Sequence, residues 1–170
     1  LPSSFIMPLT ISVVPAIAAQ IVKHNMDEAG KISEDSLRIS MAICLPMGAG
    51  LAVLSMPIMK ILYPAAHESG ALLLCLLGIA SIFVCFSLMS NAVLQASGNE
   101  KFTVYSIVAG GVAKIIVNWV LVGTPSVNIY GAPIGTLVSY FSMALMDYIF
   151  MWKTLDDRPR LIRVFSRAKR

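Results

Sequence analysis

The sequence predicts an all-α, polytopic membrane helical bundle with about five transmembrane helices, and its composition is the first observation that predicts it. Of the 170 residues, 57% are hydrophobic and only 13% are charged, and the mean hydropathy is +0.79. A soluble domain usually carries about 25% charged residues, so this chain has too few to cover a surface that faces water. A lipid bilayer is therefore its natural solvent.

The lengths of the apolar runs are the second observation. Each run holds roughly the 20 residues that a helix needs to cross the hydrocarbon core, and none shows the period of two that is typical of a strand. Polar or turn-forming segments separate the runs. The expected spans cover residues 1–22, 37–63, 71–94, 102–122 and 132–152, and a basic tail follows at 153–170.

The placement of lysine and arginine is the third observation. Eleven of the 13 basic residues fall in the segment 23–38, at Lys101, or in the tail that begins at Lys153. Five helices of alternating direction place these three segments on the same side of the membrane, and the positive-inside rule makes that side cytoplasmic. We therefore expect a multi-pass protein of the cytoplasmic membrane with its C-terminus in the cytoplasm. The same rule accounts for the basic tail without a nucleic-acid partner.

The residues that could bind a metal are scattered along the chain. Cys44, Cys75 and Cys85 all lie inside apolar runs, where buried and inert thiols are expected. His24 and His67 fall in connecting segments on opposite sides of the predicted membrane. No spacing typical of a zinc or redox site is present, so we expect no metal and no cofactor.

Several longer segments carry a family resemblance, which covers nearly the whole chain. These are LTISVVPAIAAQ (9–20), SLRISMAICLPMGAGLAVLSMPIMKILYP (36–64), NAVLQASGNEKFTVYSIVAGGVAKIIVNWVLV (91–122) and NIYGAPIGTLVSY (128–140). In order and spacing they resemble the C-terminal half of flippases of the multidrug/oligosaccharidyl-lipid/polysaccharide exporter superfamily. The most similar branch is that of stage V sporulation protein B and the lipid II flippases.

This resemblance implies a fold and a function. The five helices would be the eighth to twelfth of the family fold, which agrees with a chain that begins at Leu1 inside an apolar run and reads as part of a longer protein. The missing N-terminal lobe of the same protein would be a partner, because the family's substrate contacts are shared between both lobes. The implied substrate is a lipid-linked oligosaccharide or cell-wall precursor, moved across the membrane by alternating access.

Two polar residues in the fourth expected span are the first candidates for a substrate cavity. A lysine at bilayer depth costs roughly 2.5–3.5 kcal/mol on insertion scales, so Lys114 should face a cavity or a partner, or extend its amine to the nearer interface. Asn118 follows four residues later and lies on the same helix face. It could line the same cavity or form an interhelical hydrogen bond.

Three further polar residues are cavity candidates. Asp147, the only acid within an expected span, could couple transport to a proton or cation, or could pair with arginines at the interface. Its depth differs from that of Lys114, so a direct pair is not expected. Asn91 and Gln95 share one face near the predicted cytoplasmic end of their span, where they could cap the helix or line a gate.

Two prolines inside spans, Pro15 and Pro46, are candidates for gating kinks, with a plain packing role as the alternative. The sequence leaves other functions open beside the flippase. A cation-coupled multidrug efflux transporter of the same superfamily would need acids deep in the bundle, and only Asp147 meets that need. A membrane enzyme would need a catalytic constellation near one interface, which we do not expect. A non-transporting membrane scaffold is the remaining alternative.

Overall fold

The computed structural model describes residues 2–63, 67–122 and 131–154, and every regular element in these ranges is a helix. The helices are α1 (Pro2–Val22), α2 (Met26–Val53), α3 (Ser55–Leu62), α4 (His67–Ala96), α5 (Glu100–Val122) and α6 (Gly131–Thr154). All but α3 are long and apolar enough to cross a membrane. The predicted all-α membrane bundle is therefore confirmed.

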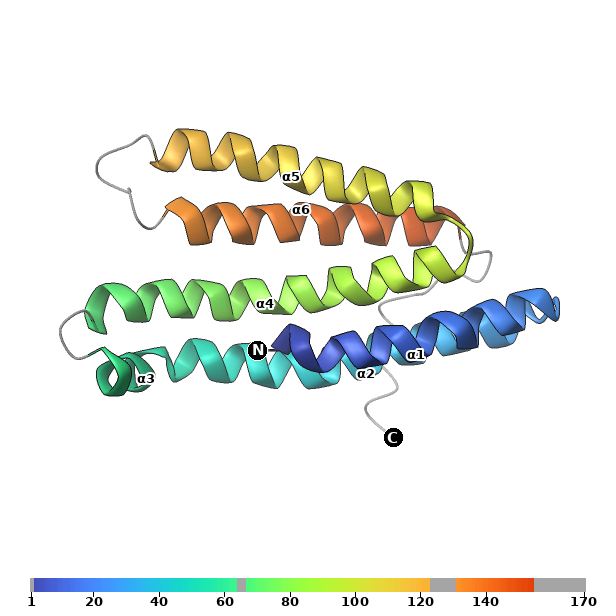
Figure 1. Cartoon of the computed structure of the whole chain (residues 1–170), viewed down its shortest axis with the longest axis horizontal. Helices are drawn as coiled ribbons and strands as arrows, with labels where there is room; N and C mark the ends of the chain where they lie inside the picture. Colours follow the sequence, from blue (N-terminus) through green and yellow to red (C-terminus); the bar gives the residue numbers. More distant parts are fainter. Residues whose placement is uncertain (1, 64–66, 123–130, 155–170) are drawn as a thin grey trace.

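Helix α4 is the centre of the bundle (Figure 1). It packs against α1 and α2 on one side and against α6 on the other, while α5 packs mainly on α6. The α5–α6 hairpin and the α1–α2 hairpin thus lie on opposite sides of α4. The α1–α2 turn, the α4–α5 turn and the C-terminal end of α6 all lie at the same end of the bundle, on the right in Figure 1. The basic segments 23–38, Lys101 and Lys153 therefore belong to a common end, and the tail beyond Thr154 lies outside the described residues.

The second helix differs from the expected span at both ends. It begins at Met26, so the polar connector is helical, and Asn25 caps it by accepting a hydrogen bond from the backbone N–H of Glu28. It ends at Val53, and residues 55–62 form the separate helix α3. Pro57 is the physical reason, because proline has no N–H and its ring clashes with the carbonyl four residues earlier, which here belongs to Val53. The expectation of one continuous helix over residues 37–63 is therefore wrong.

Two tight turns place the helices antiparallel. At the end of α4, Gly98 (φ 72°) donates its N–H to the carbonyl of Gln95 and the next residue, Asn99, donates to Leu94. These two bonds form a Schellman motif, which needs a left-handed residue. At the end of α1 His24 (φ 55°) takes the same conformation with the corresponding pair of bonds. Helix α4 ends at Ala96 and α5 begins at Glu100, so residues 97–99 form the α4–α5 turn.

Close contact between α2 and α4 depends on two glycines. A Cβ placed on Gly78 would stand 2.8 Å from the backbone nitrogen of Ala52, and one on Gly48 would stand 2.9 Å from the carbonyl oxygen of Gly78. Only glycine allows the two backbones to approach this closely, as at many helix crossings in membranes. The thiols of Cys44 and Cys85 contact each other beside this crossing, and both residues are fully buried.

The two prolines proposed as gating kinks both lie within continuous helices. Helix α1 continues through Pro15 and α2 continues through Pro46. Each proline leaves one carbonyl of the preceding turn without its usual helical donor. Their role in gating stays a prediction.

Candidate functional site

A polar hollow lies between α1, α4 and α5, near the end of the bundle that carries the α4–α5 turn. Its volume is about 370 Å³, and its polar side chains are Thr10 of α1, Asn91 and Gln95 of α4, and Thr103 of α5. Apolar side chains of the same three helices complete the wall. Of the positions expected to line a cavity, the structure thus brings Asn91 and Gln95 together.

Two residues that line the hollow have side-chain atoms whose hydrogen bonds are not satisfied among the described residues. The Oδ1 of Asn91 and the Oγ1 of Thr103 are buried and have no hydrogen-bond partner among the described residues. Buried polar groups without partners cost free energy, and such groups mark sites where water or a ligand supplies the missing bonds. Asn91 lies more than one turn before the end of α4, so it does not cap that helix. The hollow can therefore offer hydrogen bonds to a polar molecule.

Lys114 and Asn118 line neither this hollow nor the apolar one described below. The Oδ1 of Asn118 occupies the space in which a Cβ on Gly135 of α6 would stand. Lys114 is half-buried on the same side of α5, between this contact and that of Gly110 with α6. Asn118 therefore belongs to the α5–α6 contact, and Lys114 lies one turn from it on the same face of α5.

Asp147 is fully buried, with 0% of its surface exposed. Its carboxyl lies beside the hydroxyls of Ser87 on α4 and Ser106 on α5. It is therefore an interhelical residue, and the alternative of an interfacial anchor does not agree with its position. The one ion pair among the described residues joins Lys31 to Glu28, so Asp147 and Lys114 do not form a pair in this structure.

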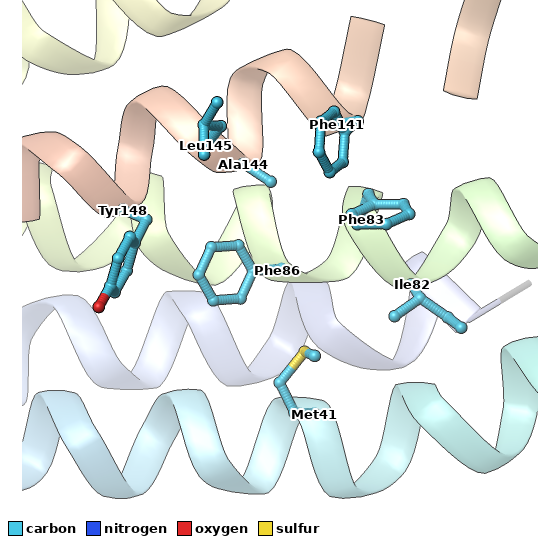
Figure 2. A pocket seen from close by; sticks show the side chains of 8 residues that line it. All are labelled: Met41, Ile82, Phe83, Phe86, Phe141, Ala144, Leu145 and Tyr148. Atoms are coloured by element: carbon cyan, nitrogen blue, oxygen red, sulfur yellow. The ribbon is translucent and has the colours of Figure 1, made fainter. Parts of the chain in front are cut away.

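A second hollow, of about 250 Å³, is apolar and lies between α2, α4 and α6. Figure 2 shows Phe83 and Phe86 of α4 in the middle of this hollow. Side chains of α6, including Phe141 and Tyr148, lie on one side of them, and Met41 of α2 lies on the other. The rings of Phe83 and Phe141 meet edge to face with their centroids 5.4 Å apart. Its lining suits hydrocarbon rather than a saccharide, because the Tyr148 hydroxyl is the only polar side-chain group among the lining residues.

Sequence reasoning missed Thr10, Thr103, Ser87 and Ser106. Hydroxyl groups are common in membrane helices because they can bond to a carbonyl of their own helix, as Ser106 does to Phe102. A single serine or threonine therefore carries little signal. The usable signal was spacing, since Ser87 and Asn91 are four residues apart and Thr103 and Ser106 are three apart, which places each pair on one helix face. The described residues contain no cluster of histidine, cysteine, aspartate and glutamate that could hold a metal ion.

Comparison with known proteins identifies the family. The model of the lipid II flippase MurJ family matches residues 1–168. The chain belongs to the lipid II flippase MurJ family. Family membership confirms the resemblance seen in the sequence and identifies the chain as part of a membrane transporter family rather than an enzyme family.

Individual relatives show the same relationship at low identity. The chain is 25% identical to the lipid II flippase MurJ of Bacillus subtilis over 98% of its own length, and 28% identical to the membrane protein YabM of the same organism over 85%. It is 32% identical to the membrane protein MJ1375 of Methanocaldococcus jannaschii over 49% of its length. The matches cover 32%, 26% and 20% of these relatives, so the chain spans about a third of their length or less. No solved structure matches the chain significantly.

Proposed function

We propose that the full-length protein moves a lipid-linked oligosaccharide or cell-wall precursor across the cytoplasmic membrane by alternating access. The observation that carries this proposal is the match of the lipid II flippase MurJ family to residues 1–168, on a bundle with five candidate spans. The described helices supply part of the transporter. A lobe from the rest of the protein completes the substrate cavity.

The polar hollow suits the headgroup of such a substrate. Asn91 and Thr103 present buried polar atoms without partners, and Thr10 and Gln95 add further hydrogen-bonding groups. Sugar hydroxyls both donate and accept hydrogen bonds, so amide and hydroxyl side chains can bind them without any net charge. The isoprenoid tail stays in the hydrocarbon, where the exposed apolar side chains of α1 and α5 also lie. Lys114, half-buried on α5, would supply a positive charge for a pyrophosphate group once the missing lobe is in place.

The proposed orientation places the common end of the bundle in the cytoplasm. Lys23, Lys31, Lys101 and Lys153 all belong to that end (Figure 1), and the positive-inside rule assigns it to the cytoplasmic side. The polar hollow, which is lined by residues near the α4–α5 turn, then lies nearer the side on which lipid-linked precursors are made. The basic tail would follow α6 on the same side.

Complementation of a bacterial strain depleted of its own lipid-linked precursor flippase tests this function. We expect the full-length protein to restore growth and to expose labelled precursor on the outer leaflet. Replacing Asn91→Leu should reduce that exposure by removing the buried amide from the hollow, and Lys114→Ala should reduce it by removing the charge. Lys60→Ala is the matched control, because Lys60 is an exposed lysine on α3 and its loss should have no effect.

The outcomes separate the alternatives. A full-length protein that reaches the membrane in normal amounts but never exposes the precursor would exclude the flippase. The buried carboxyl of Asp147 favours a second candidate, a cation-coupled multidrug efflux transporter, because such coupling needs an acid deep in the bundle. Cation-dependent drug export without precursor exposure would support that candidate. If the full-length protein neither exposes the precursor nor exports drugs, a non-transporting membrane scaffold is the remaining alternative.

A further inference from the structure

Asp147 stands at the meeting point of three helices and has no hydrogen-bond partner among the residues that the structure describes. It is fully buried on α6, and neither of its carboxyl oxygens makes a hydrogen bond. The hydroxyls beside it belong to Ser87, which is 1% exposed on α4, and to Ser106, which is 0% exposed on α5. The Ser87 hydroxyl is also buried without a partner. A buried carboxyl group surrounded in this way must be explained by a ligand or by its protonation state.

No charged group compensates Asp147 within the part of the chain that the structure describes. The hydroxyls of Ser87 and Ser106 are the only side chains that interact with it, although α6 packs against both α4 and α5. Lys114 is eight residues from Ser106, which is about 12 Å along the helix axis, and Lys101 is exposed. Among the side chains that the structure describes on these three helices, the other titratable groups do not interact with the carboxyl; they are Cys75, Cys85, Glu100, Tyr105, Tyr140, Tyr148 and Lys153.

An ionised carboxylate would be costly at this position. A buried charge without a partner costs several kcal/mol, and the surrounding bilayer adds to the cost because it contains no water to solvate the group. Protonation removes the charge. Hydrogen-bond geometry then decides whether the neutral acid fits the site.

The hydrogen bonds around the carboxyl favour the neutral acid. Ser106 already donates its hydroxyl proton to the carbonyl of Phe102, at 3.1 Å, so its oxygen can only accept a further bond. A carboxylate has no proton to donate, whereas a carboxylic acid can donate one to Ser106. The free hydroxyl of Ser87 can then donate to the second carboxyl oxygen. A proton therefore satisfies every polar atom of the trio.

A metal ion fits the same site less well. Hard cations such as Ca²⁺ take about six or more oxygen ligands, whereas one carboxyl and two hydroxyls supply four oxygens. The described residues hold no cluster of acids around Asp147 that could complete the set. The site therefore has the ligands for a proton but too few for a bound metal ion.

We propose that Asp147 binds a proton while α4, α5 and α6 are packed as in this structure, and releases it to water when the α5–α6 hairpin separates from α4. The hairpin is suited to move as a unit, because Ser139 donates to the carbonyl of Gly110 at 2.8 Å and Gly110 allows α5 to approach α6 closely. Separation keeps Ser106 with Asp147 but removes Ser87 and admits water. The O–H bond of the acid then breaks, its electron pair stays on the carboxylate, and the proton leaves as hydronium.

The proton site itself does not depend on what the protein transports, but its coupling to transport rests on the proposed function. Infrared spectroscopy of the full-length protein in lipid nanodiscs tests the site alone. At neutral pH we expect the carbonyl stretching band of a protonated carboxylic acid in a hydrophobic site, and its loss in the Asp147→Asn variant. The same band unchanged in Asp147→Asn, or its absence from the unmodified protein, would overturn the proposal.

Thermal stability distinguishes the proton from a cation. Asn resembles the neutral acid in shape and hydrogen bonding, so Asp147→Asn should keep the melting temperature of the unmodified protein at neutral pH. Asp147→Leu should lower it, because the two serines then lie beside an apolar side chain that cannot accept or donate a hydrogen bond. If sodium chloride but not choline chloride raises the melting temperature, and Asp147→Asn loses this effect, the site binds sodium. That result would overturn the proposal that Asp147 binds a proton.

Transport in proteoliposomes with an imposed pH gradient tests the coupling. We expect precursor movement by the unmodified protein to respond to the gradient, and Asp147→Asn to lose this response because it has no proton to release. A response of the same size in both proteins would refute the coupling. If the unmodified protein moves no precursor while the infrared band is present, the proposed function has failed and the proton site stands.

Discussion

At the scale of single residues, the environment of a side chain and not its type decides its role. Asp147 and Asn118 are both polar residues in apolar helices, yet Asp147 lies among hydroxyls from two other helices and Asn118 packs on Gly135. Glycines show the same dependence. Gly48 touches α4, whereas Gly50, two residues away, has no neighbour within 4 Å of the position of a Cβ.

The two glycines of α2 form a matched pair for measuring the cost of the helix crossing. Gly48→Ala places a methyl group against the backbone of Gly78 and against Ile82, and we expect it to lower the free energy of unfolding by about 1–3 kcal/mol. Gly50→Ala gains helix propensity, about 1 kcal/mol, without any clash, so its stability should not fall. Thermal unfolding of the full-length protein in detergent measures both. Equal effects of the two changes would show that α2 and α4 do not cross at Gly48.

At the scale of the helices, small residues determine which faces meet. The buried face of α2 consists mainly of Ala29, Ser33, Ser36, Leu37, Ser40, Cys44 and Gly48. The three serines donate their hydroxyls to carbonyls of their own helix, at 2.6–2.9 Å. Their polar groups are therefore satisfied internally, and the small side chains let the neighbouring helices approach.

The contact between Cys44 and Cys85 provides a test of this packing. In a full-length protein that retains only these two cysteines, we expect copper phenanthroline to form a disulfide between α2 and α4, because the two buried thiols are neighbours. Mass spectrometry of the linked peptides detects it. A protein that retains only Cys44 and Cys75 is the control and should not cross-link. Equal yields from both proteins would contradict the register of the two helices.

At the scale of the whole molecule, charge and connectivity agree. Five candidate spans of alternating direction bring the turns at Lys23 and Lys101 and the end of α6 to one end of the bundle (Figure 1). The short helix α3 and the exposed Tyr63 lie toward the other end, at the left of Figure 1. This arrangement gives the proposed orientation a direct test.

Single cysteines in an otherwise cysteine-free, full-length protein report the side of each end. We expect Lys23→Cys and Glu100→Cys to react with a membrane-impermeant maleimide only in inside-out vesicles, because both positions should face the cytoplasm. Tyr63→Cys should react from outside in intact cells. Labelling of Lys23→Cys and Glu100→Cys from opposite sides would contradict both the topology and the proposed orientation.

The class of the fold follows from the amino-acid sequence alone, because hydrocarbon excludes unsatisfied backbone groups and a long apolar run has to become a helix. The number of spans and the common end of the basic segments followed from local patterns of apolar and charged residues, whereas the family followed from the resemblance of longer segments. The helix break at Pro57 could also be predicted from the sequence, since a proline inside an apolar run interrupts the backbone hydrogen bonds. A span defined by hydropathy alone does not show the break, because the residues on both sides of Pro57 are apolar.

Which polar residues act together depends on how the helices pack against one another. Asn91 and Gln95 were expected to share a face, but their neighbours Thr10 and Thr103 come from helices that are distant in sequence or lie beyond a turn. The same is true of Ser87 and Ser106 beside Asp147. Hydropathy and charge act along the chain and can be read from it, whereas a binding site depends on the rotation of each helix about its axis. Packing among the helices sets that rotation, and no single segment specifies it.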